Sequence, residues 1–429
     1  MIVDSIGRET LIPSPCPGAG VSGALYYTRT SGTEMFCMYS IETRADLCDG
    51  AYTMLSTDNG HTWSEPVFHE AEIARPDGIL RRFPAVAVVD PHRDRFLCFL
   101  NEGLFDGDDP LQGMRRYQLR YRVSSDGGRT WDTDELMIEE GEEYDETHPF
   151  PNVWIGRNSM MFGDRTCVPI AFSDGTLLVP IQASPQGPDG TYHRPGGGYT
   201  YHDTAVISGT WRDDSTLAWK LAGMVKGDPE RSTRGLLEPT IGELDDGRIL
   251  VVMRGSNDVR PHLPGYRWFS VCDVQRDTWS PAQPWTYTDG EPFHSPSSCS
   301  QLLHHSTGRL LWIGNLYGEN PRGNRPRYPL VMAEVDTQTG LVIRDTVTAI
   351  DDRAPAESER LTLSNFHALE DRKSGDVLVT LPRYFAHVPM DGARDFTADL
   401  TLIHCGLALL REPAGGALLC SLVPRRSRV

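Results

Sequence analysis

The sequence predicts an all-β protein, a six-bladed β-propeller made of four-stranded antiparallel blades. Three observations support this fold: a glycine turn signal recurs, one octet occurs twice, and long helix-period runs are missing. A period of about 60 to 70 residues, filled by four short strands and their loops, is typical of a propeller blade. The 429 residues hold about six such periods, and we expect a single domain over residues 1–429.

The recurring signal is a polar turn, a glycine, a polar residue and then an apolar run. It occurs as SDGTLLVP, DDGRILVV, STGRLLWI and KSGDVLVT, around Gly175, Gly247, Gly308 and Gly375. Glycine permits the positive φ of a tight turn, so each copy predicts a hairpin. The first 50 residues show the pattern weakly and could close a blade with the C-terminus, which leaves seven blades as the alternative.

The repeated octets are STDNGHTW at residues 56–63 and SSDGGRTW at residues 124–131. Asp58 and Asp126 stand where a carboxylate accepts backbone N–H groups across a tight turn. The glycine of each octet permits positive φ, and the tryptophan supplies a large apolar plug between strands. Folding alone explains the octets, so we expect neither aspartate to be catalytic.

Composition argues against several classes of partner. A net charge of −18 argues against general affinity for nucleic acid or anionic membranes, and no apolar run approaches transmembrane length. Nine scattered cysteines without a C-x-x-C pair favour free thiols, and nothing indicates a metal site or a cofactor. The first residues lack the pattern of a signal peptide, so we expect a cytoplasmic protein, with a trimmed secreted form left open. The sequence does not indicate an oligomeric state.

The octet resembles the Asp box of the sialidase (neuraminidase) superfamily, in the BNR-repeat group of six-bladed propellers. SVCDVQRDTW at residues 270–279 resembles a decayed third copy, and the resemblance covers about residues 40 to 385. It implies three arginines that clamp a substrate carboxylate, an aspartate acid/base, and a tyrosine nucleophile polarised by a glutamate. Guanidinium forks match a carboxylate bidentately, and a neutral tyrosine avoids repulsion from an anionic sugar.

Two stretches resemble the family's arginine motif and its acid loop. RRFPAV at residues 81–86 makes Arg82 the first clamp candidate, with a surface arginine in a turn as the alternative. The following loop, NEGLFDGDDPLQG, contains Asp106, Asp108 and Asp109, which compete for the acid/base role. Spacing favours Asp106 and the Asp-Pro context favours Asp109; an acidic solvated turn explains the same residues.

GLLEPTIGELDDGRILVVMRGS, residues 235–256, resembles the segment that carries the family's glutamate and second arginine. Glu238 and Arg254 bracket an apolar strand pair, and an arginine at the end of ILVVMR would be costly to bury unpaired. The alternative is a buried structural ion pair. Among Arg322, Arg325 and Arg327, the pattern of the third family arginine is best met by Arg327.

The resemblance fails at the nucleophile, because Leu363 stands where the family tyrosine would stand. The next tyrosine is Tyr384, beyond the following strand, and Tyr199, Tyr201, Tyr266 or Tyr317 could also reach the site from other loops. His367 lies close to the gap and could act as a base or donor near neutral pH. A hydrogen-bonded histidine of the last blade is the alternative.

Two further loops carry residues suited to sugar faces and hydroxyls. HPFPNVWIGRNSM, residues 148–160, contains His148 and Asn158, and EPFHSPSSCSQL, residues 291–302, contains His294. Ordinary turn chemistry between blades is the alternative for both loops.

Three functions are consistent with these residues. The favoured one is a glycoside hydrolase that removes an acidic or related terminal sugar, with Arg82, Arg254 and Arg327 positioning it and a loop aspartate as acid. Glu238 would be base, nucleophile or polariser, and without a tyrosine two carboxylates would invert configuration. The alternatives are a polysaccharide lyase, in which histidine or tyrosine deprotonates a uronate, and a non-catalytic glycan-binding propeller. The sequence does not name the sugar or linkage.

Overall fold

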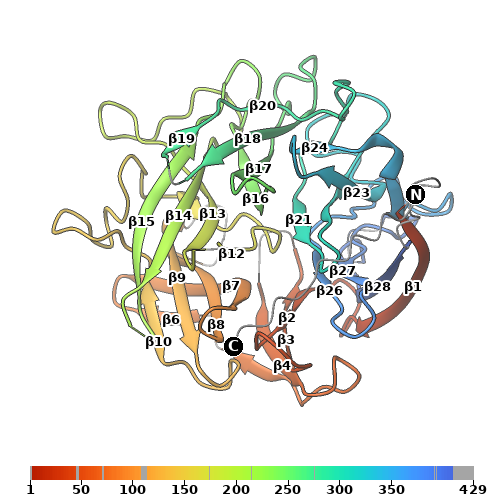
Figure 1. Ribbon diagram of the computed structural model, residues 1–429, viewed down its shortest axis with the longest axis horizontal. Helices are drawn as coiled ribbons and strands as arrows, with labels where there is room; N and C mark the ends of the chain where they lie inside the picture. Colours follow the sequence, from red (N-terminus) through yellow and green to blue (C-terminus); the bar gives the residue numbers. More distant parts are fainter. Residues whose placement is uncertain are drawn as a thin grey trace, which may run out of the picture.

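The computed structural model confirms an all-β propeller of six blades arranged in a ring (Figure 1). The structure describes residues 2–44, 48–69, 72–107, 114–172, 174–213, 215–274, 276–390, 392 and 394–408. Each blade is one antiparallel sheet of four or five strands, which agrees with the predicted blade architecture. We number the blades in chain order, so that blade six contains both ends of the described chain.

The first three blades follow one another along the chain. Blade one contains β2 (Gly20–Tyr27), β3 (Met35–Glu42), β4 (Gly50–Ser56) and β5 (Val67–His69). Blade two contains β6 (Glu72–Arg75), β7 (Gly78–Asp90), β8 (Arg95–Phe105), β9 (Met114–Ser124) and β10 (Thr133–Leu136). Blade three contains β11 (Met160–Met161), β12 (Ile170–Ala171), β13 (Leu177–Ala183), β14 (Asp203–Trp211) and β15 (Leu217–Val225).

The last three blades complete the ring. Blade four contains β16 (Leu237–Glu243), β17 (Ile249–Arg254), β18 (Arg267–Asp273), β19 (Thr278–Trp279) and β20 (Gln283–Pro284). Blade five contains β21 (Ser300–His304), β22 (Leu310–Asn315), β23 (Leu330–Asp336), β24 (Leu341–Val342), the 3-10 helix η1 (Arg344–Thr346) and β25 (Thr348–Asp351). Blade six contains β26 (His367–Glu370), β27 (Val377–Pro382), β28 (Leu400–Leu407) and the N-terminal β1 (Val3–Ile12).

The ring closes through its two ends. The N-terminal strand β1 pairs antiparallel with β28 and forms the outer edge of blade six. The N-terminal residues therefore complete the sixth blade and do not form a seventh. Inner strands such as β2 are buried along their whole length, because neighbouring blades cover both of their faces.

The predicted hairpins form at the expected glycines. Gly175, Gly247, Gly308 and Gly375 all have positive φ, between 75° and 87°. Asp126 of the second octet accepts hydrogen bonds from the backbone N of Thr130 at 2.8 Å and from its hydroxyl at 2.7 Å. Asp58 and Thr62 repeat this pattern in the first octet, at 2.8 and 2.6 Å. The carboxylates thus brace hairpin turns, as expected.

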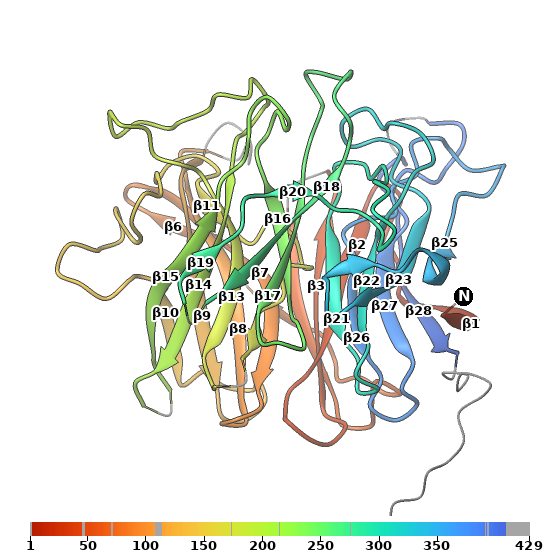
Figure 2. The same cartoon turned by 45° about the horizontal axis from the view of Figure 1, so that its top comes forward.

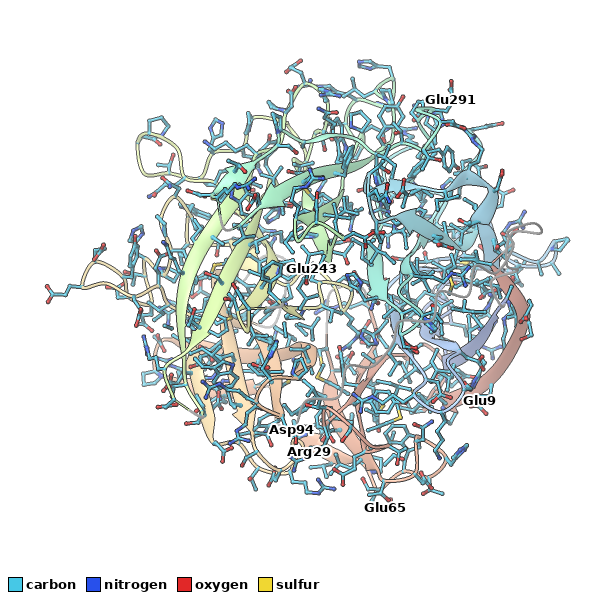
Figure 3. All side chains as sticks on the ribbon, viewed as in Figure 1. Glu9, Arg29, Glu65, Asp94, Glu243 and Glu291 are labelled. Atoms are coloured by element: carbon cyan, nitrogen blue, oxygen red, sulfur yellow. The ribbon has the colours of Figure 1, made fainter. Side chains whose placement is uncertain are left out.

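Hydrophobic clusters fill the spaces between neighbouring blades. Phe99 of β8, for example, meets Trp219 of β15 edge to face at 6.2 Å between ring centroids. Long loops gather at one end of the ring and shorter hairpins at the other (Figure 2). Charged groups lie around the outside, where Arg29 and Asp94 form an ion pair at 3.6 Å (Figure 3). Within the described ranges, no helix is long and apolar enough to cross a membrane.

Candidate active site

The innermost strand of blade three is interrupted. Its two short pieces, β11 and β12, both pair with β13, and residues 162–169 (FGDRTCVP) run between them. We call residues 162–169 the central loop. Asn101 of blade two holds its start, because the Asn101 amide donates to the Phe162 carbonyl and accepts from the Phe162 backbone N, both at 2.9 Å.

The central loop reaches across the ring to other blades. Arg165 donates from Nη2 to the Ser22 carbonyl at 3.2 Å and to Ser40 Oγ at 2.9 Å, both in blade one. Asn365, just before the first strand of blade six, donates from Nδ2 to Asp164 Oδ2 at 2.8 Å. A loop that bonds to blades one, two and six from blade three must lie near the axis of the propeller.

A cavity of about 570 Å³ adjoins the central loop, which is a volume typical of small-ligand sites. Residues from all six blades or their connections line it. Its arginines are Arg165, Arg234, Arg254, Arg325 and Arg327. Its carboxylates are Glu42, Asp164 and Glu238. The cavity therefore gathers positive groups inside a protein whose net charge is −18.

Glu238 lies at a break in the regular pairing of β16 with β17. The register shifts between Leu237 and Thr240, and Glu238 has a φ of 43°, in the left-handed region that favours glycine. The bulge presents the carboxylate to the cavity, where Oε1 accepts a hydrogen bond from Arg254 Nη1. Oε2 has no hydrogen-bond partner among the described residues. Such local strain is characteristic of functional sites.

Arg254 and Arg327 converge on one short segment of blade five. Arg254 donates from Nε to Ser297 Oγ at 2.7 Å, and Arg327 donates from Nη2 to the Ser297 carbonyl at 3.2 Å. Burial and the neighbouring Arg254 lower the pKa of Arg327 to about 10, so that its guanidinium keeps its charge at neutral pH. Its Nε has no partner within the described ranges.

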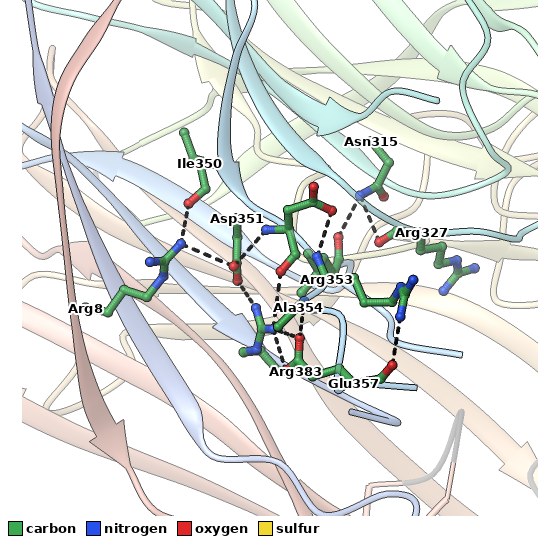
Figure 4. A network of polar contacts seen from close by, with 11 residues as sticks. Arg8, Asn315, Arg327, Ile350, Asp351, Arg353, Ala354, Glu357 and Arg383 are labelled. Carbon is green, nitrogen blue, oxygen red and sulfur yellow. Dashed lines mark hydrogen bonds and ion pairs between the residues drawn. The ribbon is translucent and has the colours of Figure 1, made fainter. Parts of the chain in front are cut away.

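One amide side chain, that of Asn315, fixes the backbone around Arg327 (Figure 4). Asn315 Nδ2 donates to the carbonyls of Arg327 and Pro329, each at 3.2 Å, and of Leu363 at 3.0 Å. Asn315 is fully buried, so these bonds are shielded from water. They hold the loop that carries Arg327 against blade six.

Asp164 belongs to the charged cluster of the cavity, which also contains Arg165, Glu238, Arg254 and Arg327. Burial and the nearby charge of Glu238 raise the pKa of Asp164 to about 7, although Arg165 and Arg327 act in the opposite direction. Its carboxylate accepts from the Asn365 amide and, at 2.6 Å, from the Arg165 backbone N. Within the described residues, no guanidinium group forms an ion pair with it. Asp164 can therefore hold a proton near neutral pH.

A tyrosine also reaches the cavity, from the connection between β27 and β28. Tyr384 donates its hydroxyl to Glu42 Oε2 at 2.9 Å, and both residues line the cavity. Burial and the Glu42 charge raise the pKa of Tyr384 well above its usual value. Phe396 stacks on the Tyr384 ring at 4.4 Å and supplies an apolar wall.

The mouth of the cavity carries one exposed aromatic ring. Tyr199 is 50% exposed and lies with its ring near the guanidinium groups of Arg157, at 5.7 Å, and Arg234, at 6.0 Å. Asn158 lines the cavity beside it, with Nδ2 at 3.5 Å from the Tyr199 hydroxyl. A ring of this kind can stack against the face of a sugar.

Comparison with solved structures finds a similar fold in proteins of low sequence identity. A protein of unknown function from Dyadobacter fermentans is 14% identical, with a TM-score of 0.61 over 95% of this chain and 100% of that chain. The Trypanosoma rangeli sialidase in complex with the inhibitor DANA is 13% identical, with a TM-score of 0.60 over 94% and 60%. A mutant of the NanB sialidase from Streptococcus pneumoniae is 12% identical, with a TM-score of 0.57 over 91% and 68%. The fold is that of the sialidases. No family model and no curated protein matches the sequence.

Within this sialidase-like fold, four of the predicted site residues come together. Glu238, Arg254, Arg327 and Asn158 line the cavity. Leu363, at the position expected for a nucleophilic tyrosine, is fully buried in the core, and its backbone N donates to the Arg327 carbonyl at 3.0 Å.

Arg82 does not line the cavity. Successive side chains of a strand point to opposite sides, and in β7 it is the neighbouring Phe83 that lines the cavity. Arg82 instead donates from Nε to Glu102 Oε2 at 2.8 Å and lies 3.7 Å from Asp134. The structure thus places this arginine in an ion-pair network on the face of blade two.

The predicted acid loop lies apart from the cavity where the structure describes it. Asp106 is exposed and pairs with Arg115 at 2.7 Å. Its charge is balanced at the surface, away from the charged cluster. Asp108 and Asp109 lie outside the described residues.

The three predicted histidines also lie outside the cavity lining. His148 stacks on Tyr144 at 5.4 Å in a surface loop. His294 stacks on Tyr266 at 5.8 Å. His367 is buried against the Tyr26 ring at 4.5 Å, and burial together with Arg165 lowers its pKa to about 3. It is therefore neutral near pH 7 and is part of the packing between blades six and one.

Sequence reasoning missed several cavity residues, namely Glu42, Asp164, Arg165, Arg234 and Asn365. One signal was present for two of them: Asp164 and Arg165 form a charged doublet inside the apolar stretch MMFGDRTCVPIAF. A charged doublet between two buried strand segments indicates a polar site or an ion pair. Among the described residues, no group of three or more His, Cys, Asp or Glu side chains is arranged to hold a metal ion.

Proposed function

We propose that this protein is a glycoside hydrolase of the sialidase-like propeller class that removes an acidic or related terminal sugar from a glycan. The observation that carries this proposal is the central cavity itself. It brings the guanidinium groups of Arg254 and Arg327 beside the carboxyl groups of Asp164 and Glu238. Guanidinium groups suit a sugar carboxylate, and carboxyl groups are the usual acid/base groups of glycosidases.

Within this proposal, Arg254 and Arg327 bind the carboxylate of the sugar. Ser297 accepts hydrogen bonds from both arginines, and both line the cavity. Glu238 acts at the reacting centre, as base, nucleophile or polariser. The Tyr384–Glu42 pair supplies a hydroxyl with a carboxylate acceptor, which would serve a retaining reaction; two carboxylates alone would serve an inverting one.

A lyase acting on uronate-containing glycans is the second candidate. His202 lines the cavity, and its Nδ1 has no hydrogen-bond partner among the described residues. Burial lowers the pKa of His202 to about 3, which makes it a weak base at neutral pH. We therefore rank the hydrolase first.

The test compares the wild-type protein with Glu238→Gln on a panel of aryl glycosides of acidic and neutral sugars and on uronate oligosaccharides. We expect sugar release from an acidic glycoside, reduced at least about 100-fold in Glu238→Gln, since a base or nucleophile contributes on this scale. Glu243→Gln, at the other end of β16 and outside the cavity lining, is the matched control and should retain activity.

The same reactions distinguish the hydrolase from the lyase and from the non-catalytic glycan-binding protein. Ultraviolet absorbance of an unsaturated uronate, without simple sugar release, would replace the hydrolase by the lyase. No product from any substrate of the panel, with glycan binding retained in wild type and in Glu238→Gln, would replace the hydrolase by a non-catalytic glycan-binding protein.

A further inference from the structure

The central loop carries a carboxyl group that none of the expected acid positions accounts for. Asp164 lines the cavity from the interruption in the inner strand of blade three, whereas Asp106 faces solvent beside Arg115. We propose that Asp164 is the general acid of this site, and that it protonates the oxygen of the departing group. This inference rests on the proposed hydrolase activity and assigns one of its catalytic residues.

The carboxyl groups of Glu238 and Asp164 have different partners. Glu238 accepts a hydrogen bond from the Arg254 guanidinium and forms an ion pair with it. Asp164 accepts from the neutral amide of Asn365 and from a backbone N, while the Arg165 guanidinium is directed to Ser22 and Ser40 of blade one. Two carboxyl groups whose surroundings differ in this way divide the acid and base roles.

The two groups are also close together. A Cβ added at Gly163, the residue before Asp164, would lie 2.5 Å from Glu238 Cγ. The glutamate side chain therefore packs directly on the backbone of the central loop. One sugar ring in a cavity of about 570 Å³ can contact both groups at once.

The proposed reaction is a hydrolysis, and water is the only reagent that it needs besides the glycoside. The bond between the anomeric carbon and the glycosidic oxygen breaks, its electron pair stays on the oxygen, and the oxygen takes the Asp164 proton. Water adds at the anomeric carbon and gives one proton to Glu238. Exchange with solvent then returns Asp164 to its acid form and Glu238 to its carboxylate form.

Charged groups from several elements set the proton affinity of Asp164. Glu238 of β16 raises its pKa, whereas Arg165 of the central loop and Arg327 of blade five lower it, and burial dominates. Because an acid must be protonated to act, we expect activity to fall as pH rises through the pKa of Asp164, near neutrality. Asn365 acts as a positioning residue in this proposal, since its amide holds the Asp164 carboxyl group.

The test compares two substrates that share one sugar but differ in the departing group, an activated nitrophenol and an alkyl alcohol. An activated phenol leaves without a proton, and an alcohol does not. Asp164→Asn should lose at least about 100-fold in kcat/KM on the alkyl glycoside and less than about 10-fold on the nitrophenyl glycoside. Asp174→Asn, in a hairpin turn of the same blade, is the matched control and should behave as wild type.

Equal losses on both substrates, or no loss on either, would overturn the assignment of Asp164. A wild-type protein that cleaves neither substrate, nor any other glycoside, would instead overturn the hydrolase proposal, so the two failures are distinguishable.

A second variant covers the case in which Asp164→Asn does not fold. Asn365 has a φ of 61°, so Asn365→Gly removes the amide without backbone strain. Loss of a hydrogen bond to the charged form raises the pKa of Asp164, and the alkaline limb of the pH profile should move to higher pH. An unmoved limb in a folded, active variant contradicts the proposal.

Discussion

At the scale of single residues, the cavity depends on guanidinium geometry as well as on charge. Arg327→Lys keeps the positive charge but loses the planar fork that matches a carboxylate. We expect KM for an acidic glycoside to rise about 10- to 100-fold with a smaller change in kcat, since a charged hydrogen bond contributes about 1.5–3 kcal/mol. Steady-state kinetics of wild type and Arg327→Lys on an acidic glycoside measure both constants.

The matched control for Arg327→Lys lies in the same loop. Arg322 is exposed and is not among the residues that line the cavity, so Arg322→Lys should leave both constants unchanged. An unchanged KM in Arg327→Lys would show that this arginine does not bind the substrate carboxylate.

The sequence predicted some site residues and missed others for a physical reason. Glu238 and Arg254 could be placed because they bracket a local strand pair, which a single hairpin turn at Gly247 joins. Arg82 could not, because a shift of one residue along a strand moves a side chain from the cavity to the sheet face. Phe83 therefore lines the cavity while Arg82 pairs with Glu102.

At the scale of elements, the octets stabilise hairpins through an ionised aspartate. Burial acts against the charged form of Asp126, but hydrogen bonds from Thr130 outweigh it and lower its pKa to about 2, from an ordinary 3.8. A depressed folded pKa gives stability that is complete above pH 3.8 and is lost as pH falls toward 2. Asp126→Asn should therefore cost about 1 kcal/mol of unfolding free energy at pH 7.

Chemical denaturation of wild type and Asp126→Asn across a pH series tests the predicted loss of unfolding free energy. The difference in unfolding free energy between wild type and Asp126→Asn should shrink as pH falls below 4 and approach zero only below a pH of about 2, the folded-state pKa of Asp126. A difference that stays constant over this range would rule out the ionised hydrogen bonds as its source. Activity per folded molecule should not change, because Asp126 lies outside the cavity lining.

The elements themselves were more predictable than the central loop. A hairpin is signalled locally, by the glycine that gives Gly247 or Gly308 its positive φ. The break between β11 and β12 has no such local signal. Its bonds run to Ser22, Asn101 and Asn365, which are far away in the sequence, and only the closed ring brings them together.

At the scale of the whole molecule, an ion cluster around the buried Asp351 joins blade five to blade six and to its N-terminal strand β1 (Figure 4). Asp351 of β25 accepts from Arg8 of β1 at 3.2 Å and also from Arg383, which pairs with Glu357 at 2.7 Å. Asp351→Asn keeps the shape but removes the charge that these guanidinium groups share. Because both arginines are partly exposed, we expect a loss of about 2 kcal/mol in unfolding free energy.

Thermal melting of Asp351→Asn and of Asp352→Asn, the exposed neighbour, measures this contribution. The second variant should melt as wild type. A melting temperature that is equally unchanged in Asp351→Asn would mean that pairing of β1 with β28 alone closes the ring.

The central loop has a consequence for how the molecule holds together. Blades that contact only their neighbours can come apart one at a time, as in other repeat proteins. Here Arg165 and Asn365 also bond the central loop of blade three to blades one and six, which are not its neighbours along the chain. Separation of one of these blades from its neighbours would therefore break hydrogen bonds of the central loop. The charged cluster forms only in the closed propeller, so the cavity and the fold should be lost together in one cooperative unfolding transition.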